Sequence, residues 1–131
     1  MRESMDSGWR RRRPQRFPVH YALEIRRGRD AAETGLLSDL GLQDAWGSAS
    51  APLLLGEGCV FHFSLWPDEP VLSFPAFVRT VYGQHFRAQL ACPDARATHA
   101  LVEWFREKRR AQESEMGLTF AAPRVRTLRT S

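Results

Sequence analysis

The stretch Val19-His20-Tyr21-Ala22-Leu23-Glu24-Ile25-Arg26 alternates between larger apolar side chains and polar or small ones. Because successive side chains of a strand point to opposite faces, this period of two predicts a β-strand with one buried face. The next four residues, Arg27-Gly28-Arg29-Asp30, have the composition of a turn. We therefore expect the folded part of the chain to open with a strand and a reversal.

Turn sequences separate further short strands up to residue 90. Pro75 lies inside one of these strands, and because proline has no N–H to donate, it predicts a bulge or an edge position. Roughly six strands with short connections predict a mainly β fold, an antiparallel barrel or a sandwich. The strands after the first are expected at about 33–38, 42–47, 59–66, 71–82 and 83–90.

Residues 93–113 change to helical spacing, with a charged face opposite an apolar one. Pro93-Asp94 is a favourable helix start, because an acidic residue there interacts with the positive end of the helix dipole. We expect an amphipathic C-terminal helix that covers one open end or side of the β-structure. Its apolar positions recur at intervals of three and four: Ala97, Leu101, Trp104 and Phe105.

The composition indicates one folded body with basic ends. The chain has 131 residues, is 43% hydrophobic and carries a net charge of +4. Its ends hold most of the positive excess, because 1–16 and 117–131 are rich in arginine and poor in acids. We expect a flexible N-terminus at 1–9, a barrel with its helix at 10–113, and a basic tail at 114–131.

The cysteines and the absence of a long apolar run indicate the compartment. Cys59 and Cys92 lie in apolar, strand-like sequence and are predicted to be reduced core residues, with a disulfide as the alternative. No run approaches the roughly 20 apolar residues that cross a bilayer. The charged N-terminus also lacks the apolar core of a signal peptide. We expect a cytoplasmic protein without membrane insertion.

An arginine-rich run, Arg10-Arg11-Arg12-Arg13-Pro14-Gln15-Arg16, leads into the first strand. Lys108 is the only lysine among the 19 basic residues. Guanidinium is planar and permanently charged, forms paired hydrogen bonds to phosphate or guanine, and stacks on flat rings. Pro14 and Pro18 favour extended backbone at the residues before them. The run predicts an anionic ligand, and the alternative is a solvated basic tail without a specific partner.

Residues with catalytic or metal-binding chemistry are scattered along the chain. The two cysteines are far apart and form no zinc signature, and no Ser, His and Asp arrangement stands out. We therefore predict no enzymatic activity, no catalytic residue, no metal and no cofactor. The histidines lie on different expected elements: His20, His62, His85 and His99. Three tryptophans are expected in the core or against the helix: Trp46, Trp66 and Trp104.

With these features in this order, the chain resembles the PilZ family of bacterial cyclic di-GMP receptor domains over about 10–110. Arg12-Arg13-Pro14-Gln15-Arg16 is similar to the first motif of that family, two arginines separated by three residues before the first strand. Leu36-Leu37-Ser38-Asp39-Leu40-Gly41 falls at the second motif, which reads Asp or Asn, any residue, Ser, two residues and Gly. Leu36 departs from that pattern, so the second motif is degenerate.

The resemblance implies an antiparallel barrel of about six strands with a C-terminal helix, in a bacterial cytoplasm. Whether the chain acts as a monomer or a homodimer stays open. It also implies that the arginine motif wraps the phosphates and guanines of cyclic di-GMP against a surface formed by the second motif. The ligand would then be a signal rather than a cofactor. The residues that the resemblance assigns to this ligand are Arg11, Arg12, Arg13, Arg16, Ser38 and Gly41.

Leu36 is the position that tests this assignment, because leucine cannot exchange hydrogen bonds with a polar ligand edge. A buried ligand group left unpaired costs about 1–3 kcal/mol, or roughly ten- to a hundredfold in affinity. Asp39 is a substitute if the strand register slips, although regular alternation predicts that Asp39 points to a different face.

Three functions fit these observations. The first is a cyclic di-GMP receptor whose ligand orders the arginine-rich N-terminal segment and creates a surface that an unidentified effector protein reads. The second is a degenerate domain that binds no nucleotide and acts as a protein-interaction module, as Leu36 indicates. The third is a small nucleic-acid-binding barrel, for which the pI of about 9.8 argues. Such binding falls steeply with salt, and nucleic acid is the least favoured partner.

Overall fold

The alternating stretch that opens the folded part belongs to strand β1 (Arg16–Arg26). Leu23 and Ile25 of this strand are buried, whereas Glu24 and Arg26 are exposed, as the period of two predicts. The structure is a computed structural model that describes residues 15–29, 32–91 and 95–115.

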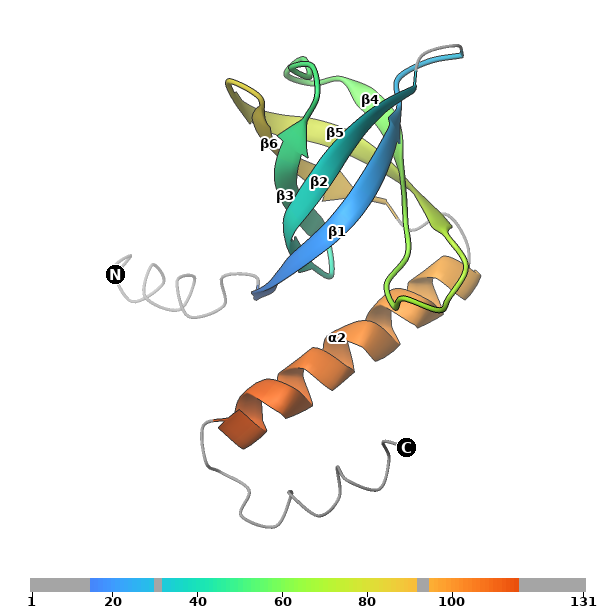
Figure 1. The fold of residues 1–131 in the computed structure, drawn as a ribbon, viewed down its shortest axis with the longest axis vertical. Helices are drawn as coiled ribbons and strands as arrows, with labels where there is room; N and C mark the ends of the chain where they lie inside the picture. The colour runs from blue at the N-terminus through green and yellow to red at the C-terminus, as the bar shows by residue number, and fades with distance from the viewer. Residues whose placement is uncertain (1–14, 30–31, 92–94, 116–131) are drawn as a thin grey trace, which may run out of the picture.

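Five more strands and one helix follow in the predicted order. The strands close into an antiparallel barrel in the order β1-β2-β3-β6-β5-β4, and helix α2 lies across one end of it (Figure 1). The predicted barrel with a C-terminal helix is confirmed, and the sandwich alternative is wrong. The elements after β1 are β2 (Ala32–Gly41), β3 (Asp44–Ala49), β4 (Gly58–Phe63), β5 (Leu72–Tyr82), β6 (His85–Leu90) and α2 (Ala95–Glu115).

Several expectations concern residues outside the described ranges. These are the flexible N-terminus at 1–9, the basic tail from residue 116 onward, Cys92, and three of the arginines assigned to the ligand: Arg11, Arg12 and Arg13.

Strands β1 and β2 are longer than predicted because their ends bury apolar residues against each other. β1 begins at Arg16 rather than at Val19, and β2 runs to Gly41, beyond the expected end at residue 38. Phe17 and Leu40 are direct partners in the β1–β2 ladder and are 6% and 0% exposed. Burial of this pair favours continued strand pairing over a bend.

Strand β2 contains an irregularity at Ser38. The register with β3 shifts between Leu37 and Asp39, and the register with β1 shifts between Pro18 and Tyr21. Leu37 and Leu40 are both fully buried although they are three residues apart, a spacing that puts side chains on opposite faces of a regular strand. The extra residue of a bulge removes this conflict and lets both leucines enter the core.

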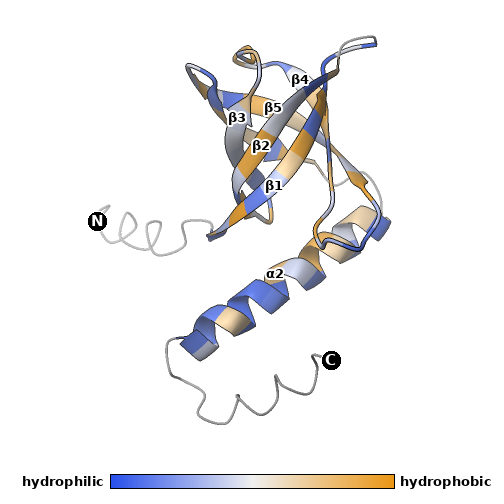
Figure 2. Ribbon diagram, in the orientation of Figure 1, coloured by the Kyte–Doolittle hydropathy of each residue, from blue (hydrophilic) through white to orange (hydrophobic). Residues whose placement is uncertain are grey.

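Helix α2 packs on the barrel through the start of β1. The ring of Phe17 meets Trp104 and Phe105 edge-on, at centroid distances of 6.1 and 5.2 Å. Trp104 Nε1 donates a hydrogen bond to the Tyr21 hydroxyl at 2.9 Å, and that hydroxyl donates to the Leu65 carbonyl at 3.0 Å. Burial raises the pKa of Tyr21, which therefore remains a neutral donor. The C-terminal half of α2 is mostly hydrophilic (Figure 2).

Pro75 occupies neither a bulge nor an edge, in contrast to the prediction. It pairs with Val60 of β4, and its carbonyl accepts a hydrogen bond from the Ala91 amide, one residue beyond β6. In a strand, the N–H and C=O of one residue point toward the same neighbouring strand. The carbonyl of Pro75 points toward β6, so its missing N–H also lies on the β6 side, at the point where the β5–β6 ladder ends. The register shift of β5 lies further on, between Val78 and Thr80.

At the other end of the barrel, Arg27 joins two loops. Its Nε and Nη2 donate to Glu57 at 2.7 and 2.9 Å, and its Nη1 donates to Glu33 at 3.0 Å. Glu57 also accepts from the Leu54 amide at 2.8 Å. Arg27 therefore ties the β1–β2 turn to the loop between β3 and β4.

Cys59 is buried and free, as predicted for a reduced core residue. Burial, together with the charge of Glu57, raises the pKa of its thiol to about 11. Thiolate is the reactive form of cysteine, so Cys59 serves packing rather than chemistry.

Candidate functional site

Arg16 and Trp46 form the centre of the candidate site. The guanidinium carbon of Arg16 lies 4.4 Å from the centroid of the Trp46 ring. Arg16 belongs to β1 and Trp46 to β3, the strands on either side of β2. Both side chains lie on the outer face of the barrel. A guanidinium above an indole face is attracted to the negative face of the ring. The pair therefore presents a fixed cation and a flat aromatic surface together.

Gly41 lets the arginine-bearing end of β1 approach this surface. Gly41 is the ladder partner of Arg16, and a Cβ at Gly41 would lie 2.7 Å from the Gln15 carbonyl oxygen. That distance is too short for any side chain. The glycine of the second motif thus admits the chain's own backbone.

Ser38 lies next to the Arg16 and Trp46 pair. The exposed Ser38 hydroxyl donates a hydrogen bond to the Trp46 carbonyl at 3.2 Å. The structure therefore brings together Arg16, Ser38 and Gly41, the described residues among those that the resemblance assigned to the ligand.

Asp39 shares the outer face of the barrel with Leu36, in contrast to the expectation that the two point to different faces. Regular alternation separates residues three apart, but the bulge at Ser38 adds one residue between them. Both side chains are half-buried, whereas the neighbouring Leu37 is buried in the core. Asp39 is also the direct ladder partner of Trp46. The outer face that lacks a carboxylate at Leu36 therefore carries one at Asp39, beside a different partner on β3.

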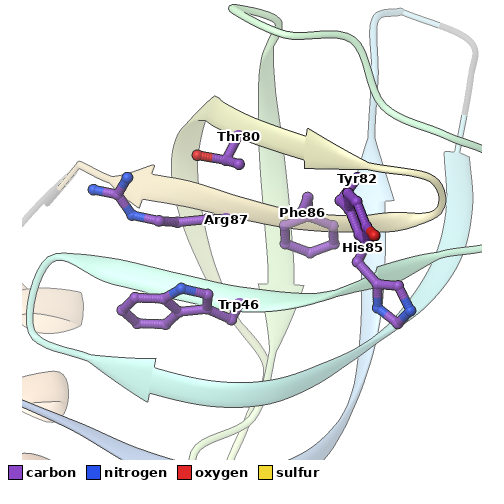
Figure 3. Close-up of a pocket in the computed structure, with 6 residues that line it drawn as sticks. All are labelled: Trp46, Thr80, Tyr82, His85, Phe86 and Arg87. Carbon is purple, nitrogen blue, oxygen red and sulfur yellow. The ribbon is translucent and has the colours of Figure 1, made fainter.

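A pocket of about 220 Å³ adjoins Trp46 on the outside of β3, β6 and β5 (Figure 3). Pockets that hold drug-sized ligands measure about 300–1,000 Å³, so this pocket suits a single flat ring rather than a whole ligand. Its lining combines aromatic and cationic side chains: Trp46, Thr80, Tyr82, His85, Phe86 and Arg87.

Arg87 adds a second cation beside Trp46. It is the ladder partner of Trp46 across the β3–β6 pair. Its Nη2 lies 3.7 Å from a carboxylate oxygen of Asp44, and its side chain is 42% exposed. Asp44 thus holds Arg87 by one long contact and leaves other guanidinium donors available to a ligand.

The prediction that Trp46 packs in the core or against the helix is wrong. Its neighbours Ala45 and Gly47 are buried, so Trp46 lies on the outer face of β3. Trp104 is fully buried as expected, and Trp66 is half-buried with its Nε1 donating to Glu107 at 3.0 Å. Alternation around Trp46 was the available signal, since small residues on both sides leave the large ring outward.

Arg87, Asp44 and the pocket were not recognised from the sequence. Their proximity depends on the pairing of β3 with β6, which are separated in the chain by β4 and β5. Within 15–29, 32–91 and 95–115, no group of three or more His, Cys, Asp or Glu could hold a metal ion. No helix in the same ranges is long and apolar enough to cross a membrane.

Comparisons with known proteins place this geometry in a known fold. No family model matches the chain, and no curated protein matches it. Among solved structures, the PilZ domain of CeSA from a cellulose-synthesizing bacterium is similar, with a TM-score of 0.58 and 16% identity over 72% of this chain and 98% of that one. The chain therefore has the fold of a PilZ domain, which confirms the fold that the resemblance implied.

A second similar structure is the Bacillus subtilis inhibitor of motility, MotI/DgrA. The TM-score is 0.61 and the identity is 12%, over 74% of this chain. The chain spans about half of that protein, 50% of its length.

Proposed function

We propose that this chain is a receptor domain for cyclic di-GMP that signals to a partner protein. The observation that carries the proposal is the stack of Arg16 on Trp46 beside a ring-sized pocket. Cyclic di-GMP is a dianion with two guanine bases, so it needs cations and flat surfaces together. Arg16 and Arg87 supply the charge, and Trp46 supplies the surface.

Asp39 completes the chemistry that guanine requires. The Watson–Crick edge of guanine carries two adjacent N–H donors, and a carboxylate accepts from both. Asp39 faces the same side as Leu36 and pairs with Trp46 in the ladder. A guanine that stacks near Trp46 would therefore have an acceptor within the same surface.

The arginine-rich run provides the switch in this proposal. Arg11, Arg12 and Arg13 precede Arg16, which is already held against Trp46. Ligand phosphates would draw these residues onto the barrel, and the ordered segment would form a new surface for an effector. Similarity to a PilZ domain and to an inhibitor of motility supports a signalling role over catalysis.

Calorimetric titration of the full chain with cyclic di-GMP tests the proposal. We expect the wild type to bind cyclic di-GMP saturably and the Arg16→Ala variant to bind it much more weakly. The wild type should not bind GTP at the same concentration. Amide exchange at residues 9–17 should slow at saturating ligand. Absence of heat at high nucleotide concentration contradicts the receptor function.

A second function is favoured by Leu36, an apolar side chain on the outer face where the motif has Asp or Asn. In this case the domain binds no nucleotide and acts as a protein-interaction module. A partner complex would then form without nucleotide and persist in the Arg16→Ala variant. Dependence of that complex on cyclic di-GMP contradicts this alternative.

A further inference from the structure

The pocket beside Trp46 is bounded by two rungs of the sheet formed by β3, β6 and β5. Trp46, Arg87 and Thr80 are ladder partners across these strands and form one rung. His85 and Tyr82 pair with each other and belong to the next rung with exposed side chains. Figure 3 shows Arg87 and Trp46 at one end of the group and Tyr82 and His85 at the other. Because residues two apart in a strand are separated by about 7 Å, one flat ring fits between the rungs.

The walls of the pocket are largely aromatic. Trp46 stands on one rung, Tyr82 stands on the other, and Phe86 contributes to the lining between them. Tyr82 is 79% exposed, so its ring is available to a ligand. Nucleic-acid bases stack on aromatic side chains because every base has a π face, whereas a phosphate loses hydration against such rings. The pocket therefore suits a nucleobase better than a phosphate.

Arg87 is the one permanently charged side chain among the described residues that line the pocket. Its Nη2 lies 3.7 Å from Asp44, which is 8% exposed and is the only buried charged residue in the described part of the chain. One end of the guanidinium is thus restrained, while the side chain as a whole stays 42% exposed. Guanidinium has five N–H donors and no acceptor, so most of its donors remain for a ligand.

The donors of Arg87 determine which base the pocket accepts. Guanine presents two adjacent acceptors, O6 and N7, and arginine bonds to both at once. Adenine presents N7 beside the N6 amino group, whose hydrogens would meet the hydrogens of the guanidinium. The remaining polar groups of the lining offer both donors and acceptors and so do not select between the bases: Thr80, Tyr82 and His85.

The pocket and Arg16 lie on opposite sides of Trp46. In the barrel order, β2 and β1 are on one side of β3, and β6 and β5 are on the other. Arg16 and Asp39 approach Trp46 from β1 and β2, and neither lines the pocket. A ligand with two bases can therefore place one base on each side of Trp46.

We propose that the pocket takes one guanine of the ligand and that Arg87 is a specificity-determining residue, which binds O6 and N7 of that base. This inference rests on the receptor function proposed above and assigns the two bases of the ligand to different sides of Trp46. The other guanine is then left for Asp39. A dinucleotide that brings adenine to the pocket binds more weakly, because its amino group opposes Arg87.

Calorimetric titration of the full chain with three dinucleotides tests the proposal: cyclic di-GMP, the mixed cyclic GMP–AMP, and cyclic di-AMP. We expect the wild type to prefer cyclic di-GMP over the mixed dinucleotide by about tenfold or more, the discrimination of one paired contact. Glutamine forms paired hydrogen bonds with N6 and N7 of adenine. Arg87→Gln should therefore lower that preference by about tenfold or more.

Arg79→Gln is the matched control. Arg79 belongs to the neighbouring strand β5, donates from Nε and Nη2 to Gln89 Oε1 at 3.0 and 2.8 Å, and does not line the pocket. The control removes the same charge from the same sheet and should keep the wild-type preference among the three dinucleotides. Circular dichroism checks that both variants remain folded.

An analogue of the ligand tests the contact atom by atom. Cyclic di-GMP with 7-deazaguanine bases lacks the N7 acceptors, so the wild type should bind it roughly tenfold more weakly than cyclic di-GMP. Arg87→Ala has no donor for N7 in the pocket and should discriminate much less between the two ligands. An undiminished difference in Arg87→Ala overturns the assignment of this contact.

The outcomes separate this inference from the receptor function. Absence of binding of all three dinucleotides to the wild type removes the receptor function, and this inference with it. Binding by the wild type with the same base preference in Arg87→Gln overturns this inference alone. Equal weakening of all three dinucleotides in Arg87→Gln would mean that Arg87 contacts a phosphate, which also overturns it.

Discussion

The guanidinium carbon of Arg16 lies over the ring of Trp46, 4.4 Å from the ring centroid. Cation–π contacts at exposed sites contribute about 0.5–1 kcal/mol, which is enough to favour one orientation of an exposed arginine. In β1, Arg16 faces outward while the next residue, Phe17, packs on helix α2. The stack therefore fixes the last residue of the arginine motif before any ligand arrives.

We expect Arg16→Ala and Trp46→Leu each to lower the affinity for cyclic di-GMP at least tenfold. Both remove part of the surface that receives a charged, aromatic ligand, and base stacking alone contributes about 1–3 kcal/mol. Arg16→Lys should also weaken binding, because lysine keeps the charge but loses the planar stack. Calorimetric titration measures the affinities.

The matched control for the arginine is Arg29→Ala, an exposed arginine in the turn after β1. It removes the same charge at the opposite end of the strand and should leave the affinity almost unchanged. Equal losses in Arg16→Ala and Arg29→Ala would show that net charge, and not the stack, governs binding.

Asp39 is expected to carry the role that the second motif gives to its first residue. Asp39→Ala should lower the affinity for cyclic di-GMP roughly ten- to a hundredfold, the cost of an unpaired guanine edge. Adding Leu36→Asp to that variant should restore part of the affinity, since both positions share the outer face. If Asp39→Ala binds as well as the wild type, the carboxylate does not contact the ligand.

Gly41→Ala should destabilise the fold by about 1–3 kcal/mol, because overpacking against backbone forces the strands apart. The added Cβ would lie 2.7 Å from the Gln15 carbonyl oxygen. Gly58→Ala is the matched control in another strand, since its Cβ would lie 3.3 Å from the Phe77 ring, and a side chain can turn away. Urea denaturation should show the larger loss for Gly41→Ala, and equal losses would contradict the steric explanation.

The barrel could be predicted because its strands and helix have clear periods. The stretch 19–26 alternates strictly, and the helix that begins at Ala95 repeats at three and four. Strand ends were less predictable, because the burial of Phe17 against Leu40 depends on a partner in another strand. Pairing across the barrel decides where such strands stop.

The candidate site was only partly predictable. Arg16, Ser38 and Gly41 were assigned from the resemblance to the two PilZ motifs, whereas the face of Asp39 depends on the bulge at Ser38. Leu37 and Leu40, three apart and both apolar, were the available sign of a bulge. The pairing of Arg87 with Trp46 depends on the order of strands in the barrel, which local patterns do not contain.

Arg27 is expected to stabilise the end of the barrel away from α2. Arg27→Ala leaves two partly buried carboxylates, Glu33 and Glu57, without their cation, and hydrogen bonds to charged groups contribute about 1.5–3 kcal/mol. Allowing for partial solvent exposure, we expect a loss of about 1–3 kcal/mol at neutral pH in urea denaturation. Arg26→Ala, the neighbouring exposed arginine, is the control and should change stability by less than about 0.5 kcal/mol.

The effect of Arg27→Ala should also depend on pH. Hydrogen bonds from Arg27 lower the pKa of Glu57 below its ordinary value of 4.5. A carboxylate with a lowered pKa in the folded state contributes stability that is complete above the ordinary value and disappears as pH falls through the folded value. When the pH is lowered from neutral to well below 4.5, the wild type should therefore lose more stability than the Arg27→Ala variant. A gap between the two proteins that stays constant as the pH falls would mean that Arg27 acts by packing and not by its contact with Glu57.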